Sequence, residues 1–142
     1  MAVFHGSQKG VFMKIKEYAT GLQHIGLPTM DLEKTTKFYQ ELGFEIAHSA
    51  YLEDKDQHVN FLKLGDLCIE AYEEKEAAMC YGAIEHVAIN VTDIYAVYDI
   101  ICEKGLNTLN DQVNALPFWT NGVKYFTIEG PNKEKVEFSK YL

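Results

Sequence analysis

The chain contains an internal repeat, and this repeat restricts the possible folds more than any other feature. Placing His24 over His86 aligns residues 21–44 with residues 83–106 without a gap, at an offset of 62 positions. Several aligned pairs are identical or chemically alike, namely Asp31 with Asp93, Leu32 with Ile94, Glu41 with Glu103, and Gly43 with Gly105. A chain of 142 residues that repeats at this period is predicted to contain two copies of one structural unit.

Each copy has the pattern of a strand, a turn and a helix. Asp31 and Asp93 precede runs of apolar residues at helical spacing, where a carboxylate can accept the free amide protons of a first helical turn. Gly43 and Gly105 follow these runs, at the place where a left-handed residue commonly ends a helix. The sequence therefore predicts one capped helix in each copy.

The repeat continues downstream as two strands joined by a turn. Residues 58–73 match residues 123–142, with Phe61 over Phe126 and two additional residues in the second turn. Each copy then has the order βαβββ. The predicted fold class is α+β, with two tandem βαβββ modules.

Turn residues and composition divide the chain further. Asn121-Gly122 predicts a type I′ turn that joins Phe118-Trp119 to a strand starting at Val123. We assign four segments to the chain: a leader or disordered terminus at 1–12, the first module at 13–72, a linker at 73–82 and the second module at 83–142.

Four polar residues fall on the strand faces that the helices do not cover. Side chains alternate between the two faces of a strand, and His24 and His86 point away from the apolar residues that face each helix. Glu70 and Glu137 each lie between two apolar residues of a final strand. Each copy thus supplies one histidine from its first strand and one glutamate from its last.

These residues have two interpretations. Taken singly, each is a solvated polar residue on an open sheet or a histidine with a local hydrogen bond. A divalent metal accounts for all four together, because two neutral imidazoles and two carboxylates balance its charge. Nitrogen and oxygen ligands without a thiolate suit nickel, zinc, cobalt, manganese or iron(II).

The composition excludes several classes of partner. The net charge of −8 argues against a nucleic acid or an anionic membrane, and no apolar run reaches the length of a membrane span. Three cysteines without a CxxC spacing predict reduced thiols and a cytoplasmic location. All 13 basic residues are lysines, so no guanidinium is present to bind a carboxylate by two parallel hydrogen bonds.

The sequence resembles the vicinal oxygen chelate superfamily, which includes glyoxalase I, bleomycin-resistance proteins and extradiol dioxygenases. The resemblance covers most of 20–142 and rests on HIGLPTMDLEKTTKFYQELGF, CIEAYE, GAIEHVAINVTD and GPNKEKVEF. It implies that the two sheets curl into a cup and that one divalent metal binds there, with nickel favoured over the other candidate ions. By the same resemblance the metal ligands are His24, Glu70, His86 and Glu137.

The resemblance also implies an activity, that of a lactoylglutathione lyase. Such an enzyme moves a proton on the hemithioacetal of a 2-oxoaldehyde and a thiol, through an enediolate that the metal stabilises. Glu137 is then the base, Glu70 is a ligand or second base, and Phe118 and Trp119 line the cup. The expected partners are a small-molecule substrate and a second copy of the chain in a homodimer.

Three points stay open at this level. Members that use glutathione hold its carboxylates with arginines, so the lack of arginine argues against glutathione as the thiol. The same fold also supports a non-catalytic protein that sequesters a drug, which needs no metal. An iron(II) extradiol-type dioxygenase or an epimerase is a further alternative.

Overall fold

The computed structural model describes residues 17–142 except 19 and 83, so the predicted leader at 1–12 lies outside the described residues. The first module contains β1 (Ile25–Thr29), α1 (Leu32–Glu41), β2 (Glu45–Leu52), β3 (Gln57–Leu64) and β4 (Leu67–Glu73). The second contains β5 (His86–Asn90), α2 (Ile94–Glu103), β6 (Asn114–Leu116), β7 (Val123–Glu129) and β8 (Lys135–Tyr141). The order of the elements confirms two tandem βαβββ modules.

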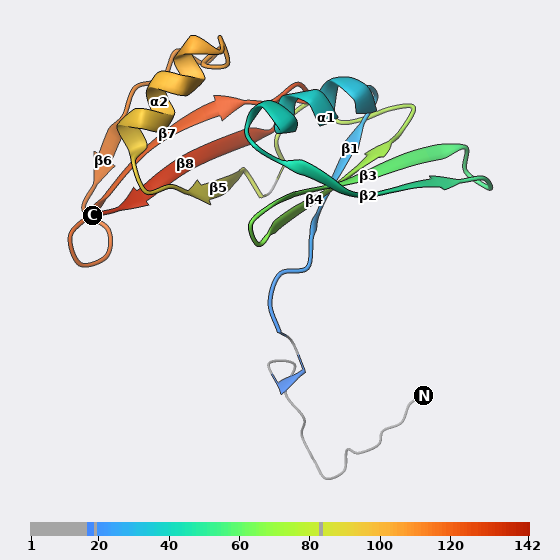
Figure 1. The fold of residues 1–142 in the computed structure, drawn as a ribbon, viewed down its shortest axis with the longest axis horizontal. Coiled ribbons are helices and arrows are strands. Elements are labelled where there is room, and N and C mark those ends of the chain that lie inside the picture. Colours follow the sequence, from blue (N-terminus) through green and yellow to red (C-terminus); the bar gives the residue numbers. More distant parts are fainter. Residues whose placement is uncertain (1–16, 19, 83) are drawn as a thin grey trace.

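Each module forms one mixed sheet of four strands, and the two sheets have matching topology. The strand orders are β1-β4-β3-β2 and β5-β8-β7-β6. The first strand of each module runs parallel to the last, and the remaining pairs are antiparallel. The two sheets lie side by side, with α1 and α2 on the same side of them (Figure 1). Within the described residues, the opposite faces carry no helix.

Both helices begin and end as the repeat predicts. The Asp31 carboxylate accepts the amide proton of Lys34 at 3.0 Å, and Asp93 accepts that of Ala96 at 3.1 Å. Gly43 and Gly105 adopt φ values of 103° and 71°, in the left-handed region that favours glycine. These caps fix where each strand-to-helix connection leaves its sheet.

The core lies between the helices and the sheets and joins the two modules. In β5 the burial alternates, with Val87 and Ile89 turned inward and their neighbours exposed, as the period of a half-buried strand requires. The buried apolar cluster draws on both modules and consists of Leu32, Tyr39, Phe44, Leu62, Ile69, Ala71, Ile94, Ile101, Phe126, Ile128, Val136 and Phe138. Residues next to Glu70 and Glu137 are thus in the core, while the two glutamates face away from it.

The strand register corrects one part of the sequence alignment. Phe61 lies opposite Glu70, whereas Thr127 lies opposite Glu137 and Phe126 lies opposite Phe138. Thr127 therefore occupies the place of Phe61. The pairing of Phe61 with Phe126 was wrong by one residue, which moves a side chain to the other face of the sheet.

The second hairpin is also longer by one residue than the first, not by two. The pair Lys63 and Cys68 encloses four residues, whereas the pair Glu129 and Lys135 encloses five. A glycine stands in the turn of both hairpins, Gly65 in the first and Gly130 in the second, and aligning these two glycines shifts the strand before them by one residue.

The predicted tight turn at Asn121-Gly122 is wrong as well. Strand β6 ends at Leu116, which pairs with Val123, so the connection is a six-residue loop at 117–122. Gly122 has a φ of 93°, but Trp119 also has a positive φ, of 62°. Phe118 and Trp119 therefore lie in the loop and not in a strand.

A polar contact joins the longer hairpin of the second module to α1 of the first. The Asn132 amide donates to the Thr35 hydroxyl at 2.9 Å, and the Tyr39 hydroxyl donates to the Glu134 carboxylate at 2.9 Å. Asn132, Thr35 and Tyr39 are buried, so these bonds form in a poorly solvated place. Burial and the nearby carboxylate raise the pKa of the Tyr39 phenol well above its ordinary value, which keeps the proton on the donor.

Each of the two helices has ten residues. Across the described part of the chain, no helix is long and apolar enough to cross a membrane. All three cysteines, Cys68, Cys80 and Cys102, are free thiols.

Candidate metal centre

The first module brings His24 and Glu70 together. His24 immediately precedes β1, and Glu70 lies in β4 opposite Gly26. Paired residues of neighbouring strands point to the same face, and residues two apart along a strand do so as well. His24 precedes Gly26 by two residues, so His24 and Glu70 lie on the same, helix-free face. The His24 Nε2 atom is 3.3 Å from the Glu70 Oε1 atom.

The second module repeats this arrangement. His86 is the first residue of β5, and Glu137 lies in β8 opposite Ala88. The His86 Nε2 atom is 3.4 Å from the Glu137 Oε1 atom. The predicted residues therefore form two equivalent His–Glu pairs, one in each module.

The other ring nitrogen of each histidine has a hydrogen-bond acceptor. The Nδ1 atom of His24 lies 2.9 Å from Gln23 Oε1, and that of His86 lies 3.0 Å from Glu85 Oε1. A carbonyl or carboxylate oxygen can only accept, so Nδ1 is the donor in both contacts, and in the neutral form of each imidazole it carries the one ring proton. The Nε2 atom then presents its lone pair towards the glutamate.

A ring nitrogen and a carboxylate oxygen at this separation attract each other when a proton or a metal cation lies between them. Imidazole nitrogen and carboxylate oxygen are both ligands of first-row divalent metals. The donor set of each pair, and the protonation that Gln23 and Glu85 impose on the histidines, thus fit a divalent cation.

The two glutamates differ in their surroundings. The Glu137 side chain is 18% exposed, compared with 29% for Glu70. Burial raises the pKa of the Glu137 carboxyl, the negative charge of Glu85 raises it further, and His86 opposes both effects. A carboxylate that binds its proton more tightly than usual is suited to accept a proton from a substrate.

The structure does not bring all four residues together within one chain. Among residues 17–142, leaving aside 19 and 83, no three histidine, cysteine, aspartate or glutamate side chains are close enough to hold one ion. Each module of a single chain thus presents half of the predicted ligand set.

Phe118 and Trp119 lie on the loop at 117–122, and their side chains are 54% and 76% exposed. The Trp119 ring contacts the edge of Tyr141, with 5.8 Å between ring centres. Their role in substrate binding stays a prediction.

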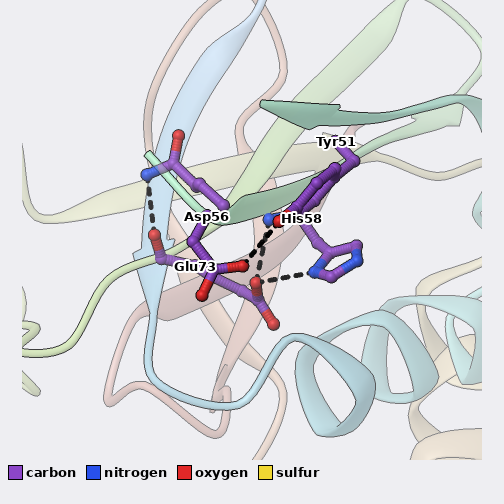
Figure 2. A network of polar contacts seen from close by, with 5 residues as sticks. Tyr51, Asp56, His58 and Glu73 are labelled. Atoms are coloured by element: carbon purple, nitrogen blue, oxygen red, sulfur yellow. Dashed lines mark hydrogen bonds and ion pairs between the residues drawn. The ribbon is translucent and has the colours of Figure 1, made fainter. Parts of the chain in front are cut away.

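His58 belongs to a surface contact. The Nδ1 atom of His58 donates to the Glu73 carboxylate at 3.0 Å, and the backbone amide of His58 donates to the same oxygen at 2.8 Å. Nearby, the Tyr51 hydroxyl donates to Asp56 at 2.7 Å (Figure 2). This network joins the β2–β3 turn to β4, and within the described residues it contains no group of three side chains placed to hold one metal ion.

Sequence reasoning did not single out Gln23 or Glu85. Each directly precedes a histidine, in LQH and IEH, and both are hydrogen-bond acceptors at the same place of the repeat. The alignment of residues 21–44 with residues 83–106 already pairs Gln23 with Glu85, and comparing these two acceptors gives this signal.

Two open sheets of matching topology, placed side by side, define a protein class with a glyoxalase-like fold. The sequence profile of the Glyoxalase/Bleomycin resistance protein/Dioxygenase superfamily matches residues 21–138, and the chain belongs to this superfamily. It is 29% identical over 131 residues to the uncharacterized protein YwbC of Bacillus subtilis, a match that covers 84% of this chain and 97% of YwbC.

Solved structures have the same fold. The glyoxalase family protein of Enterococcus faecalis superposes with a TM-score of 0.67 at 19% identity, over 86% of this chain and 98% of that one. The fosfomycin resistance protein FosX of Listeria monocytogenes, in complex with Mn(II) and sulfate, superposes with a TM-score of 0.64 at 20% identity, over 87% and 94%. At these identities the likeness establishes the fold alone.

Proposed function

We propose that this protein is a metal-dependent lyase of the glyoxalase I type, which moves a proton on the hemithioacetal of a 2-oxoaldehyde and a thiol. The observation that carries the proposal is the pair of matching His–Glu contacts, at 3.3 and 3.4 Å, on the helix-free faces of the two modules. The proposed ligands are His24, Glu70, His86 and Glu137. The Mn(II) held by FosX supports the choice of a divalent cation for this fold, and nickel is the first ion to test.

The reaction assigns distinct tasks to these residues. A bound divalent cation would polarise the substrate oxygens and stabilise the negative charge that develops on them during the reaction. The Glu137 carboxylate removes the proton from one carbon of the substrate and returns it to the neighbouring carbon, which gives a 2-hydroxyacyl thioester. Glu137 suits this task better than Glu70, because its side chain is less exposed and its pKa is raised.

The proposal requires the two halves to meet, and we infer that they meet between two copies of the chain. The support is that no described group of three ligands forms within one chain, while each half is already arranged in its own module. A C2 homodimer places the first module of each copy against the second module of the other, so that two equivalent sites form.

Mixing two inactive variants tests this inference. In a site shared between chains, a dimer of one His24→Ala chain and one His86→Ala chain has one doubly altered site and one intact site. An equimolar mixture, unfolded and refolded together, then regains about a quarter of the wild-type activity, because half of the dimers are mixed. If each site is built within one chain, the mixture stays as inactive as its components.

The activity itself is tested by turnover of methylglyoxal with a series of thiols, on protein loaded with nickel or zinc. The series has to include thiols without carboxylates, because the chain has no arginine to bind the carboxylates of glutathione. Formation of a 2-hydroxyacyl thioester supports the proposal. Oxygen uptake with catechols, or ligand binding that survives Glu137→Gln without metal, would support the dioxygenase or the sequestering protein in its place.

A further inference from the structure

Glu85 lies beside His86 but is not one of the proposed ligands. Its Oε1 atom is 3.0 Å from Nδ1 of His86, and its Oε2 atom is 3.6 Å from Nζ of Lys135. The same Nζ lies 4.4 Å from the centre of the Tyr81 ring. Glu85 is therefore held from two sides, by an imidazole and by an ammonium group that an aromatic ring supports.

The first module has the same hydrogen bond without the charges. Gln23 takes the place of Glu85, with 2.9 Å between its Oε1 atom and Nδ1 of His24. Cys68, two residues before Glu70, takes the place of Lys135, two residues before Glu137. Among the described residues, a carboxylate–ammonium pair next to the histidine, Glu85 with Lys135, is thus specific to the second module.

The orientation of His86 determines which nitrogen can bind a metal. In a neutral imidazole only one nitrogen carries the proton, and the hydrogen bond made by that nitrogen sets the tautomer and the plane of the ring. An acceptor at Nδ1 leaves the lone pair on Nε2, which is the atom 3.4 Å from Glu137. The hydrogen bond from His86 to the charged carboxylate of Glu85 is of a stronger kind than the one from His24 to the neutral amide of Gln23.

We propose that Glu85 is the positioning residue of His86: its carboxylate accepts the Nδ1 proton, and Lys135 holds that carboxylate in place, so that Nε2 faces Glu137 ready to bind the metal. The inference deepens the proposed function and rests on it for the metal. It also predicts an asymmetric centre, in which the second module holds its histidine more firmly than the first.

The tautomer of His86 is measured first, in metal-free protein at a pH where the imidazole is neutral. Nitrogen and carbon chemical shifts of the ring distinguish a proton on Nδ1 from one on Nε2. We expect the Nδ1–H form in the wild type and a shift towards the Nε2–H form in Glu85→Ala. Glu85→Gln keeps an acceptor at the same position, as Gln23 does for His24, and is expected to restore the Nδ1–H form.

Zinc affinity is measured second, by competition between the full-length protein and a chromophoric chelator. Loss of the acceptor in Glu85→Ala is expected to weaken Zn²⁺ binding by about 10–100-fold, and Glu85→Gln is expected to recover most of that loss. Glu53→Ala removes the same charge from the exposed β2–β3 turn and is expected to leave the affinity unchanged.

The two readouts separate this inference from the proposed function. A wild type that binds no Zn²⁺ overturns the metal centre, and the tautomer measurement still decides the role of Glu85. The inference is overturned if Glu85→Ala keeps the Nδ1–H form, or if it binds Zn²⁺ as the wild type does. It is also overturned if Glu53→Ala or Glu85→Gln loses as much affinity as Glu85→Ala, because charge alone would then explain the effect.

Discussion

The two modules have the same topology and the same His–Glu contact, yet they differ in what surrounds that contact. In the first module, Glu70 is 29% exposed and His24 has a neutral acceptor. In the second, Glu137 is 18% exposed and Glu85 brings a negative charge. The duplication thus preserves the proposed ligands, while their neighbours have diverged.

The difference indicates a division of work between the halves of the proposed centre. Partial burial and the charge of Glu85 raise the pKa of Glu137, which suits a group that exchanges protons. The hairpins differ as well, because within the part of the chain that the structure describes only the longer one, through Asn132, forms a buried hydrogen bond to the other module. The second module therefore provides the proposed base, and its hairpin provides the donor of a buried hydrogen bond between the modules.

The largest expected effect comes from neutralising the two glutamates one at a time. Glu137→Gln removes the proposed base, and we expect kcat to fall by about 10²–10⁴-fold even at saturating metal. Glu70→Gln removes only a ligand, so excess metal should restore a larger share of the rate. Steady-state kinetics over a range of nickel concentrations measures both. Equal losses at saturating metal would contradict the division of work.

A smaller effect is expected at the hairpin turns. Asn132→Ala removes the buried hydrogen bond to Thr35, which we expect to lower the free energy of unfolding by about 1–2 kcal/mol. Asp66→Ala alters the exposed turn of the first module and should change it by less than about 0.5 kcal/mol. Urea denaturation measures both variants. Equal effects would show that the buried contact between the modules adds no stability.

The smallest effect concerns the pH dependence of stability in metal-free protein. The pKa of Glu137 is higher in the folded than in the unfolded chain, so the folded state binds this proton more tightly. The resulting stability is complete below the unfolded pKa and is lost as the pH rises through the folded pKa. Glu137→Gln should lack this loss, which urea denaturation at a series of pH values detects. An identical pH profile in the variant would contradict the raised pKa.

Much of this architecture follows from local sequence signals. Asp31 and Asp93 cap helices because their carboxylates accept nearby amide protons, and such contacts need no tertiary information. The alternation around Glu70 and Glu137 placed both glutamates on helix-free faces for the same reason. The fold class, and the presence of one histidine and one glutamate on the helix-free face of each module, could therefore be predicted.

Other features depend on register and loop conformation, which the sequence specifies less directly. Phe61 and Phe126 look alike in the sequence, but cross-strand pairing assigns them to opposite faces. Asn121-Gly122 resembles a tight turn, but the strand ends earlier, at Leu116, and Trp119 takes a positive φ inside a longer loop. In both cases distant strands, not neighbouring residues, determine the result.

The most direct test of the proposed centre is its metal stoichiometry. Tag-free protein is incubated with nickel or zinc, dialysed extensively and analysed by mass spectrometry, with His86→Ala and His24→Ala treated in parallel. We predict about one ion per chain in the wild type and almost none in His86→Ala. Wild-type protein that retains no metal under any loading condition would contradict the proposal, and the two histidines would then be structural residues.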